Sequence, residues 1–270
     1  MRDAAGACDR AVAFVDAVGD GFSAWRAAAL VAGRPVQACP LPDDVVQRPD
    51  GSFAASDSPG AEPAWGALLR VIGALDDVRA LHLPVVERAC AHLAATQVDD
   101  GSWGPADASE DERIFFTGML AGHFGKTRFA RASMLAGAGD YIAERFSPER
   151  VQNFAWRAVA AYAHYFANVP HEAGDAVLQW TGRELERGLR TRRFDAVQTG
   201  RVLLYVDAPG LPGGRVDAAE VVDRILAEQA VDGGWLRPED PAPEARVAHT
   251  LDALAALVRF VRSGRRGLAP

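Results

Sequence analysis

The chain has 270 residues, of which 49% are hydrophobic and 24% are charged, and its formal net charge is −7. This composition is typical of a folded globular protein, and we expect residues 1–270 to form one domain without extensive disorder. Nucleic acids attract clustered Lys and Arg, so the acidic balance predicts no nucleic-acid partner.

The compartment and the relation to membranes follow from two further features. Cys8, Cys39 and Cys90 are few, odd in number and widely spaced, which predicts no disulfide framework and favours a cytoplasmic protein. No stretch approaches the roughly 20 apolar residues of a membrane span. We therefore expect no transmembrane segment, with contact at a membrane surface left open.

Helical spacing of apolar residues covers most of the chain, and clusters of Gly, Pro and Asp separate the segments. No segment alternates with the two-residue period of a strand, so we predict an all-α fold. The predicted helices, in chain order, are 7–18, 22–32, 61–75, 81–96, 109–123, 128–145, 148–168, 171–189, 195–207, 217–230 and 243–263.

A short turn pattern occurs three times between these helices, at 47–53, 97–103 and 229–235. Each copy reads Gln-x-x-Asp-Gly, then Ser or Gly, then an aromatic residue. Asp-Gly favours a tight turn in which Gly takes positive φ. We expect the Gln amide to bond the backbone of the next helix and the aromatic ring to cover its start.

Related helix openings suggest a repeat that extends beyond these turns. An aromatic residue or Thr, followed by small and apolar residues, occurs at six anchors: Trp25, Trp65, Thr117, Trp156, Thr199 and Thr250. Their spacing suits two helices plus turns, so six helical hairpins could close into a ring with inner and outer helices. An open helical solenoid of the TPR or HEAT type is the alternative.

The Gln…Asp-Gly-x-Trp turn followed by a Thr-containing helix resembles the QW repeat of squalene-hopene and oxidosqualene cyclases, and the related repeat of prenyltransferase β subunits. The resemblance implies an α/α toroid of about six helical hairpins, with any function in a central cavity. Fold alone does not specify function, so the chemistry has to be sought at the motif positions of these families.

Two family motifs meet at the same segment, residues 195–199, which read Asp-Ala-Val-Gln-Thr. Terpene cyclases that start by protonation carry Asp-x-Asp-Asp-Thr, and Val197 replaces their proton donor. Protein prenyltransferases begin the comparable helix with Asp-x-Cys and complete a zinc site with a later His, so Asp195 and His249 match two ligands while Val197 replaces the Cys. Catalytic zinc normally has three protein ligands, and we predict no metal and no cofactor.

Asp195 and His249 open consecutive predicted inner helices, and the resemblance places them across the cavity from each other. As a pair they could perform acid/base catalysis. Individually, Asp195 could be an N-cap and His249 a buried histidine with satisfied hydrogen bonds. Cyclases use aromatic rings on inner helices to stabilise carbocations and to shape an apolar pocket. Our candidate substrate-binding residues are six aromatic residues and one aspartate: Trp25, Trp65, Phe116, Trp156, Tyr162, Tyr205 and Asp252.

Metal-dependent diphosphate chemistry has little support in the sequence. Asp76 and Asp77 begin an aspartate-rich motif that lacks its last carboxylate, so we expect them at a solvated helix end. His164, His171 and Glu172 do not form an HExxH arrangement.

We therefore predict a terpene-cyclase-like enzyme that cyclises or isomerises a hydrophobic substrate, isoprenoid or polyketide-like, by acid/base or conformational control. A non-catalytic toroid that binds a lipid or a protein is one alternative, and a zinc-dependent prenyltransferase β-like subunit is another. The oligomeric state is not predicted.

Overall fold

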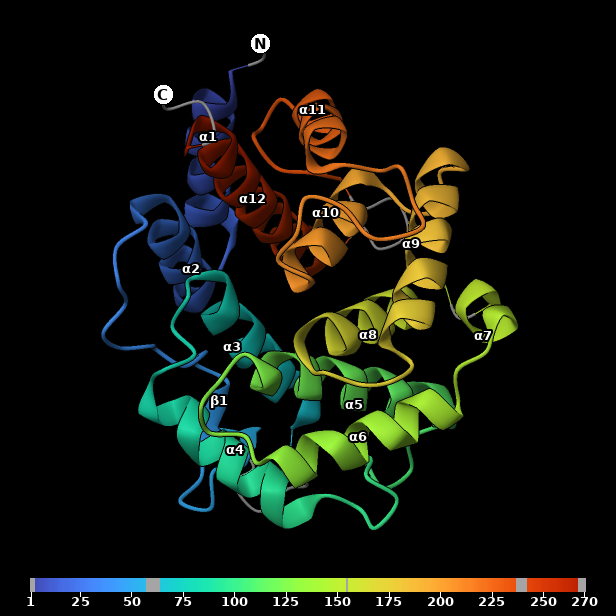
Figure 1. Ribbon diagram of the computed structural model, residues 1–270. Helices are drawn as coiled ribbons and strands as arrows, with labels where there is room; N and C mark the ends of the chain where they lie inside the picture. The colour runs from blue at the N-terminus through green and yellow to red at the C-terminus, as the bar shows by residue number, and fades with distance from the viewer. Residues whose placement is uncertain (1–2, 57–63, 154, 237–241, 267–270) are drawn as a thin grey trace.

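The computed structural model describes residues 3–56, 64–153, 155–236 and 242–266. These residues contain twelve α-helices and a single two-stranded sheet, so the all-α prediction is confirmed (Figure 1). The elements in chain order are α1 Ala4–Val18, α2 Gly21–Ala32, β1 Val45–Gln47, β2 Phe53–Ala55, α3 Trp65–Asp77, α4 Pro84–Thr96, α5 Glu110–Gly125, α6 Ala132–Glu144, α7 Pro148–Asn153, α8 Ala155–Asn168, α9 Gly174–Arg190, α10 Ala196–Tyr205, α11 Ala218–Glu228 and α12 Pro243–Arg266.

The small sheet corrects the expectation of no strands. β1 and β2 pair antiparallel, with Val45 opposite Ala55 and Gln47 opposite Phe53. Their turn is closed by Asp50, whose carboxylate accepts from Ser52, and by Gly51, whose φ is 89°. Each strand is three residues long, so neither is long enough to show a recognisable period in the sequence.

Six helices contact one another in succession and form an inner layer. The order is α3, α5, α8, α10, α12 and then α2. An ion pair between Arg26 of α2 and Asp77 of α3 joins the two ends of this series. The α/α toroid of the resembled families stays a prediction, but this succession is the arrangement that it requires.

Outer helices pack against this inner layer. α1 contacts α2 and α12, α6 contacts α5, α9 contacts α8, and α11 contacts α10 and α12. Between α2 and α3, where another outer helix would complete the repeat, the described chain contains the β1–β2 hairpin instead. The described chain thus has a pair of strands at this position, and the arrangement of about six hairpins in a ring stays a prediction.

The Gln side chains of the repeated turns bond a helix backbone as predicted, but the helix is the following outer one rather than the next helix in the chain. The side-chain amide of Gln97 donates to Gly101 O at 2.8 Å and to Met134 O in α6 at 2.9 Å. Gln47 makes the same pair of bonds to Gly51 and to Val85 of α4. Each amide thus satisfies a carbonyl of its own turn and one of the following outer helix, which fixes the turn between them.

The tryptophans of two of these turns are buried and connect an outer helix to the next inner one. Trp103 donates its indole N–H to Leu93 O of α4 at 2.9 Å, and its backbone N–H donates to Thr117 Oγ1 of α5 at 3.0 Å. Trp235 bonds Ile225 of α11 and Thr250 of α12 in the same way. The anchors Thr117 and Thr250 therefore fix where an inner helix meets its turn.

Candidate active site

The direction of the inner helices defines two faces of the molecule. Residues at the C-terminal ends of α2, α3 and α10, together with the middle of α12, line one common cavity of about 290 Å³. The N-termini of α2, α3 and α10 must therefore lie toward the opposite face. The predicted residues Trp25, Trp65, Trp156 and Asp195 all lie at or near the N-termini of inner helices.

Asp195 both caps a helix and lies beside His249. It is the N-cap of α10: its Oδ1 accepts from Gln198 N at 2.7 Å, and Gln198 Oε1 accepts from Asp195 N at 3.1 Å, which forms a capping box. Its other oxygen, Oδ2, lies 3.3 Å from His249 Nε2. The cap fixes the carboxylate through one oxygen and leaves the other for the histidine.

His249 and Asp195 differ in their access to solvent. The side chain of His249 is 6% exposed, whereas that of Asp195 is 32% exposed. The carboxylate is therefore the member of the pair that a bound molecule can reach, with the imidazole behind it. Such a geometry lets His249 orient the carboxylate and stabilise its charge.

Glu228, at the end of α11, is a neighbour of this pair that sequence reasoning missed. Partial burial and the negative charge of Asp195 raise its pKa. A carboxylate of raised pKa beside a second carboxylate is a common feature of acid/base sites. No motif marks Glu228, because it belongs to an amphipathic helix in which a Glu is unremarkable.

Aromatic side chains surround the N-terminal ends of the neighbouring inner helices. The rings of Trp65 and Phe116 lie 6.1 Å apart, and Phe115 contacts Phe116 at 5.9 Å. Trp156 donates its indole N–H to Gln198 O at 2.8 Å, which attaches it to the cap of α10. These predicted rings are partly exposed, as is Trp25, which stacks on Phe22 at 5.6 Å.

Three other predicted substrate-binding residues lie elsewhere. Tyr162 is fully buried in the packing of α8 against the chain that follows α6, and its hydroxyl donates to Arg145 O at 3.1 Å. Tyr205 and Asp252 belong to a polar network among the inner helices. The structure therefore groups Trp65, Phe116 and Trp156 along the face that carries Asp195. Tyr162, Tyr205 and Asp252 lie away from that group.

This interior network differs from the apolar interior that we expected. Arg26 pairs with Asp77 and, at 2.9 Å, with Asp252, while Arg201 pairs with Asp77 and lies 3.7 Å from Asp252. Arg201 also lies over the ring of Tyr205 at 4.5 Å. Burial acts against the charge of Arg201, but Asp77, Tyr205 and Asp252 raise its pKa well above the ordinary value.

Asp76 and Asp77 are not at a solvated helix end, which corrects a second expectation. The side chain of Asp77 is 5% exposed, and Asp76 contacts His123 and Lys126. Their partners are distant in sequence: Arg26 is 51 residues from Asp77, and Arg201 is 124 residues from it. The sequence shows that a helix ends here, but not that other helices cover its end.

Comparison with known proteins gives one local similarity. No family model matches the chain, and no solved structure matches it. A stretch of 71 residues is 45% identical to part of drimenyl diphosphate synthase from Streptomyces showdoensis; it makes up 25% of this chain and 13% of that protein. The similarity thus hints at the terpene-cyclase superfamily that the turns resemble.

The search for membrane-spanning helices was negative for the described residues. None of their helices combines the length and the apolar character that crossing a bilayer demands.

Proposed function

We propose that the chain is a terpenoid-related enzyme that cyclises or isomerises an isoprenoid substrate at the N-terminal face of an α/α toroid. The observation that carries the proposal is the contact between Asp195 Oδ2 and His249 Nε2, beside the partly exposed ring of Trp156. The local similarity to drimenyl diphosphate synthase supports the isoprenoid class of substrate.

In this proposal Asp195 exchanges a proton with the substrate. Its capped oxygen keeps the carboxylate in place, and His249 holds the second oxygen and balances its charge when the proton leaves. Trp65, Phe116 and Trp156 supply aromatic faces, which attract a developing carbocation. Val197 has no acidic proton, so the acid role falls to Asp195 rather than to the position used by the resembled cyclases.

The test uses purified protein and a panel of isoprenyl diphosphates with 10, 15 and 20 carbon atoms, which are roughly the sizes that a ring of helices can enclose. Products are treated with phosphatase and analysed by gas chromatography and mass spectrometry. We expect a rearranged or cyclic product from at least one substrate. Asp195→Asn and His249→Gln should each lower turnover by about 100-fold or more, the usual contribution of acid/base groups.

Asp217→Asn is the matched control. Asp217 caps α11 as Asp195 caps α10, by accepting from Glu220 N at 2.9 Å, but among the described residues no histidine pairs with it. It should keep full turnover. Full turnover in both Asp195→Asn and His249→Gln would contradict the catalytic pair. If no substrate of the panel gave a product, the proposal that the chain is an enzyme would be contradicted.

A non-catalytic toroid that binds a lipid or a protein is the second candidate. The charges that meet inside the ring, Arg26, Asp77, Arg201 and Asp252, favour it because they occupy space that a cyclase would give to substrate. Native mass spectrometry separates the two: a co-purified apolar molecule that the wild-type protein never converts, or a retained partner chain, supports binding alone.

A zinc-dependent prenyltransferase-like subunit would use Asp195 and His249 as ligands. The two residues lie together, but Val197 stands at the third ligand position. Val197→Cys should then create zinc binding at this face, measured by elemental analysis, and failure to gain zinc removes this candidate.

A further inference from the structure

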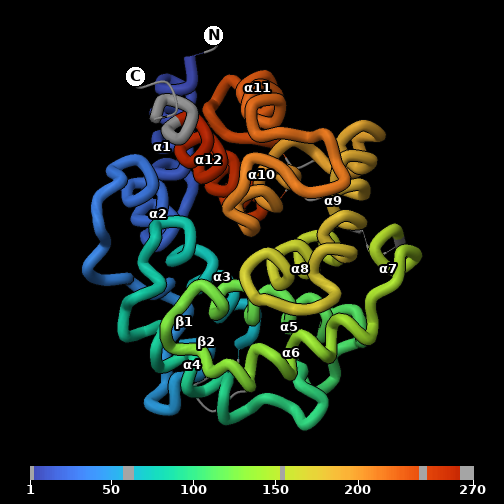
Figure 2. The backbone as a smooth tube through the Cα atoms, in the orientation of Figure 1, coloured from blue at the N-terminus to red at the C-terminus, as the bar shows by residue number. Residues whose placement is uncertain are grey.

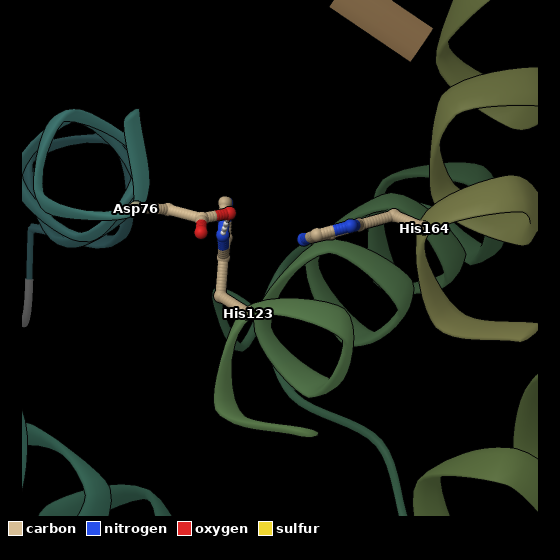
Figure 3. Close-up of side chains that lie close together, drawn as sticks. All are labelled: Asp76, His123 and His164. Carbon is tan, nitrogen blue, oxygen red and sulfur yellow. Dashed lines mark hydrogen bonds and ion pairs between the residues drawn. The ribbon is translucent and has the colours of Figure 1, made fainter. Parts of the chain in front are cut away.

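Three potential metal ligands converge at the other end of the inner helices. Asp76 lies near the end of α3, His123 near the end of α5 and His164 on α8, and their side chains point toward one another (Figure 3). One ligand atom from each lies within 4.8 Å of the others. Both histidines are enclosed, with His123 1% exposed and His164 completely buried.

Close packing of α5 against α8 brings the two histidines together. Glycines on α5 face α8 at Gly118, Gly122 and Gly125. A Cβ on Gly118 would lie 2.8 Å from Ala161 O, and one on Gly122 would overlap the imidazole of His164. The side chain of His164 therefore uses space that only glycine leaves free.

Hydrogen bonds determine which nitrogen of His164 is available. Its Nδ1 lies 3.0 Å from Tyr205 O, and a carbonyl can only accept. Asn168 Nδ2 lies 3.3 Å from the same nitrogen, but it donates its two protons to His164 O and Tyr205 O at 2.7 and 2.9 Å, so Nδ1 carries a proton. Nε2 is then an acceptor, and among the described residues it has no hydrogen-bond partner. It points toward His123, whose Nδ1 lies 3.0 Å from Asp76 Oδ2.

A completely buried nitrogen without a partner is uncommon in a native protein, and a bound ion is one of the ways in which such an atom is satisfied. Two imidazoles and one carboxylate are a common ligand set for zinc and neighbouring divalent metals, which are bound at about 2.0–2.2 Å. Tetrahedral coordination would require these three ligand atoms to draw together.

We propose that Asp76, His123 and His164 bind a divalent first-row transition metal of the zinc type, with one coordination position open toward solvent. Asp76 also lines two adjoining cavities at the C-terminal face, so a small molecule can approach the site from there. The proposal is independent of the reaction proposed for Asp195 and His249.

Lys126 is the group that competes with the metal. Its Nζ lies 2.8 Å from Asp76 Oδ2, and its side chain is 18% exposed. The ammonium neutralises the carboxylate in the absence of a metal ion. Since Lys126 also lines the outer cavity, its flexible side chain has space to turn away when a metal binds.

The site is tested by titrating chelator-treated, full-length protein with zinc against a chromophoric chelator, and with cobalt while recording its visible absorption. We expect one equivalent of either metal and a cobalt spectrum of low coordination number. Asp76→Asn and His164→Gln should weaken binding by more than about 100-fold, beyond the effect of outer-sphere changes. Lys126→Met should tighten it about 10-fold or more, because a competing charge is removed.

His171→Gln is the matched control, since His171 lies 3.6 Å from Asp140 in a comparable pair outside the cluster. It should bind metal as the wild type does. Circular dichroism establishes that each variant is folded, and Lys126→Met gives a result even if the buried His164 variant does not fold. The proposal is overturned if neither the wild type nor Lys126→Met binds one equivalent, or if a folded His164→Gln binds it undiminished.

Discussion

Single charged residues between the inner helices connect segments that are far apart in the sequence. Asp77 holds Arg26 of α2 and Arg201 of α10, and Asp252 of α12 contacts both arginines. Buried ion pairs of this kind contribute little net stability, but removing one partner leaves an uncompensated charge and is costly. The network therefore specifies how the inner helices meet more than it stabilises them.

Asp252→Asn tests this network through its pH dependence. Burial alone would raise the pKa of Asp252, but the charges of Arg201 and Arg26 outweigh it and lower the pKa. The carboxylate therefore stabilises the fold above its unfolded pKa of about 3.9, and this contribution disappears as the pH falls below it. At pH 7 the free energy of unfolding of the variant, measured in urea, should be about 1–3 kcal/mol lower than that of the wild type. The loss is not larger because the Asp252 side chain is 29% exposed and partly screened by solvent.

The difference from the wild type should shrink as the pH falls from 5 toward 3. Asp44→Asn is the control: Asp44 pairs with Arg70 at 2.7 Å on the surface, and its loss should cost less than about 1 kcal/mol. A difference for Asp252→Asn that stays constant down to pH 3 would sink the argument, since it would not come from the charge.

At the scale of elements, α5 and α8 pack closely against each other, and glycine makes that approach possible. Gly73 of α3 offers the contrast, because an added Cβ there would meet Arg201 Nη2 at 3.6 Å and His123 Nε2 at 3.8 Å. Those are ordinary van der Waals distances. Two buried helical glycines, Gly73 and Gly122, therefore differ in what a methyl group would encounter.

Gly73→Ala should stabilise the protein by about 0.5–1 kcal/mol, the usual gain of alanine over glycine inside a helix. Gly122→Ala should destabilise it by about 1–3 kcal/mol, since the new methyl overlaps the His164 ring and forces α5 and α8 apart. Both are measured by urea unfolding at pH 7. Equal shifts for the two variants would show that packing between α5 and α8 is not what requires glycine.

The elements also show what the sequence could reveal. Helical periodicity located the helices, although the predicted segment 148–168 forms two of them, α7 and α8. The Gln-x-x-Asp-Gly pattern predicted that the Gln amide bonds a helix backbone, but not which helix. Gln47 and Gln97 bond carbonyls 38 and 37 residues away, in the following outer helix, which a local motif does not specify. Asp195 and His249 were paired through the resemblance, and they lie together in the structure. The environment of Asp76 depends on His123 and Lys126, which no local pattern connects to it.

At the scale of the whole molecule, the first and last helices lie side by side. α1 packs against α12 and α2, as Figure 2 shows for the tube of the backbone. The turn after α11 reaches across to α1: Gln229 Nε2 donates to Ala7 O at 2.9 Å, and Arg10 Nη2 donates to Gln229 Oε1 at 2.6 Å. The Gln side chains of the other two turns bond the following outer helix. Gln229 bonds α1 instead, so this turn connects the two ends of the described chain.

Gln229→Ala tests whether this contact couples the two ends. It leaves Ala7 O and Gly233 O without their amide donor, and should lower the free energy of unfolding by about 1–3 kcal/mol. Hydrogen exchange measured by mass spectrometry should rise in both α1 and α11, since local opening at this contact frees them together. Gln47→Ala removes the same kind of bond at α4 and should raise exchange there while α1 stays protected. If Gln229→Ala leaves α1 as protected as in the wild type, the two ends are held together by helix packing alone.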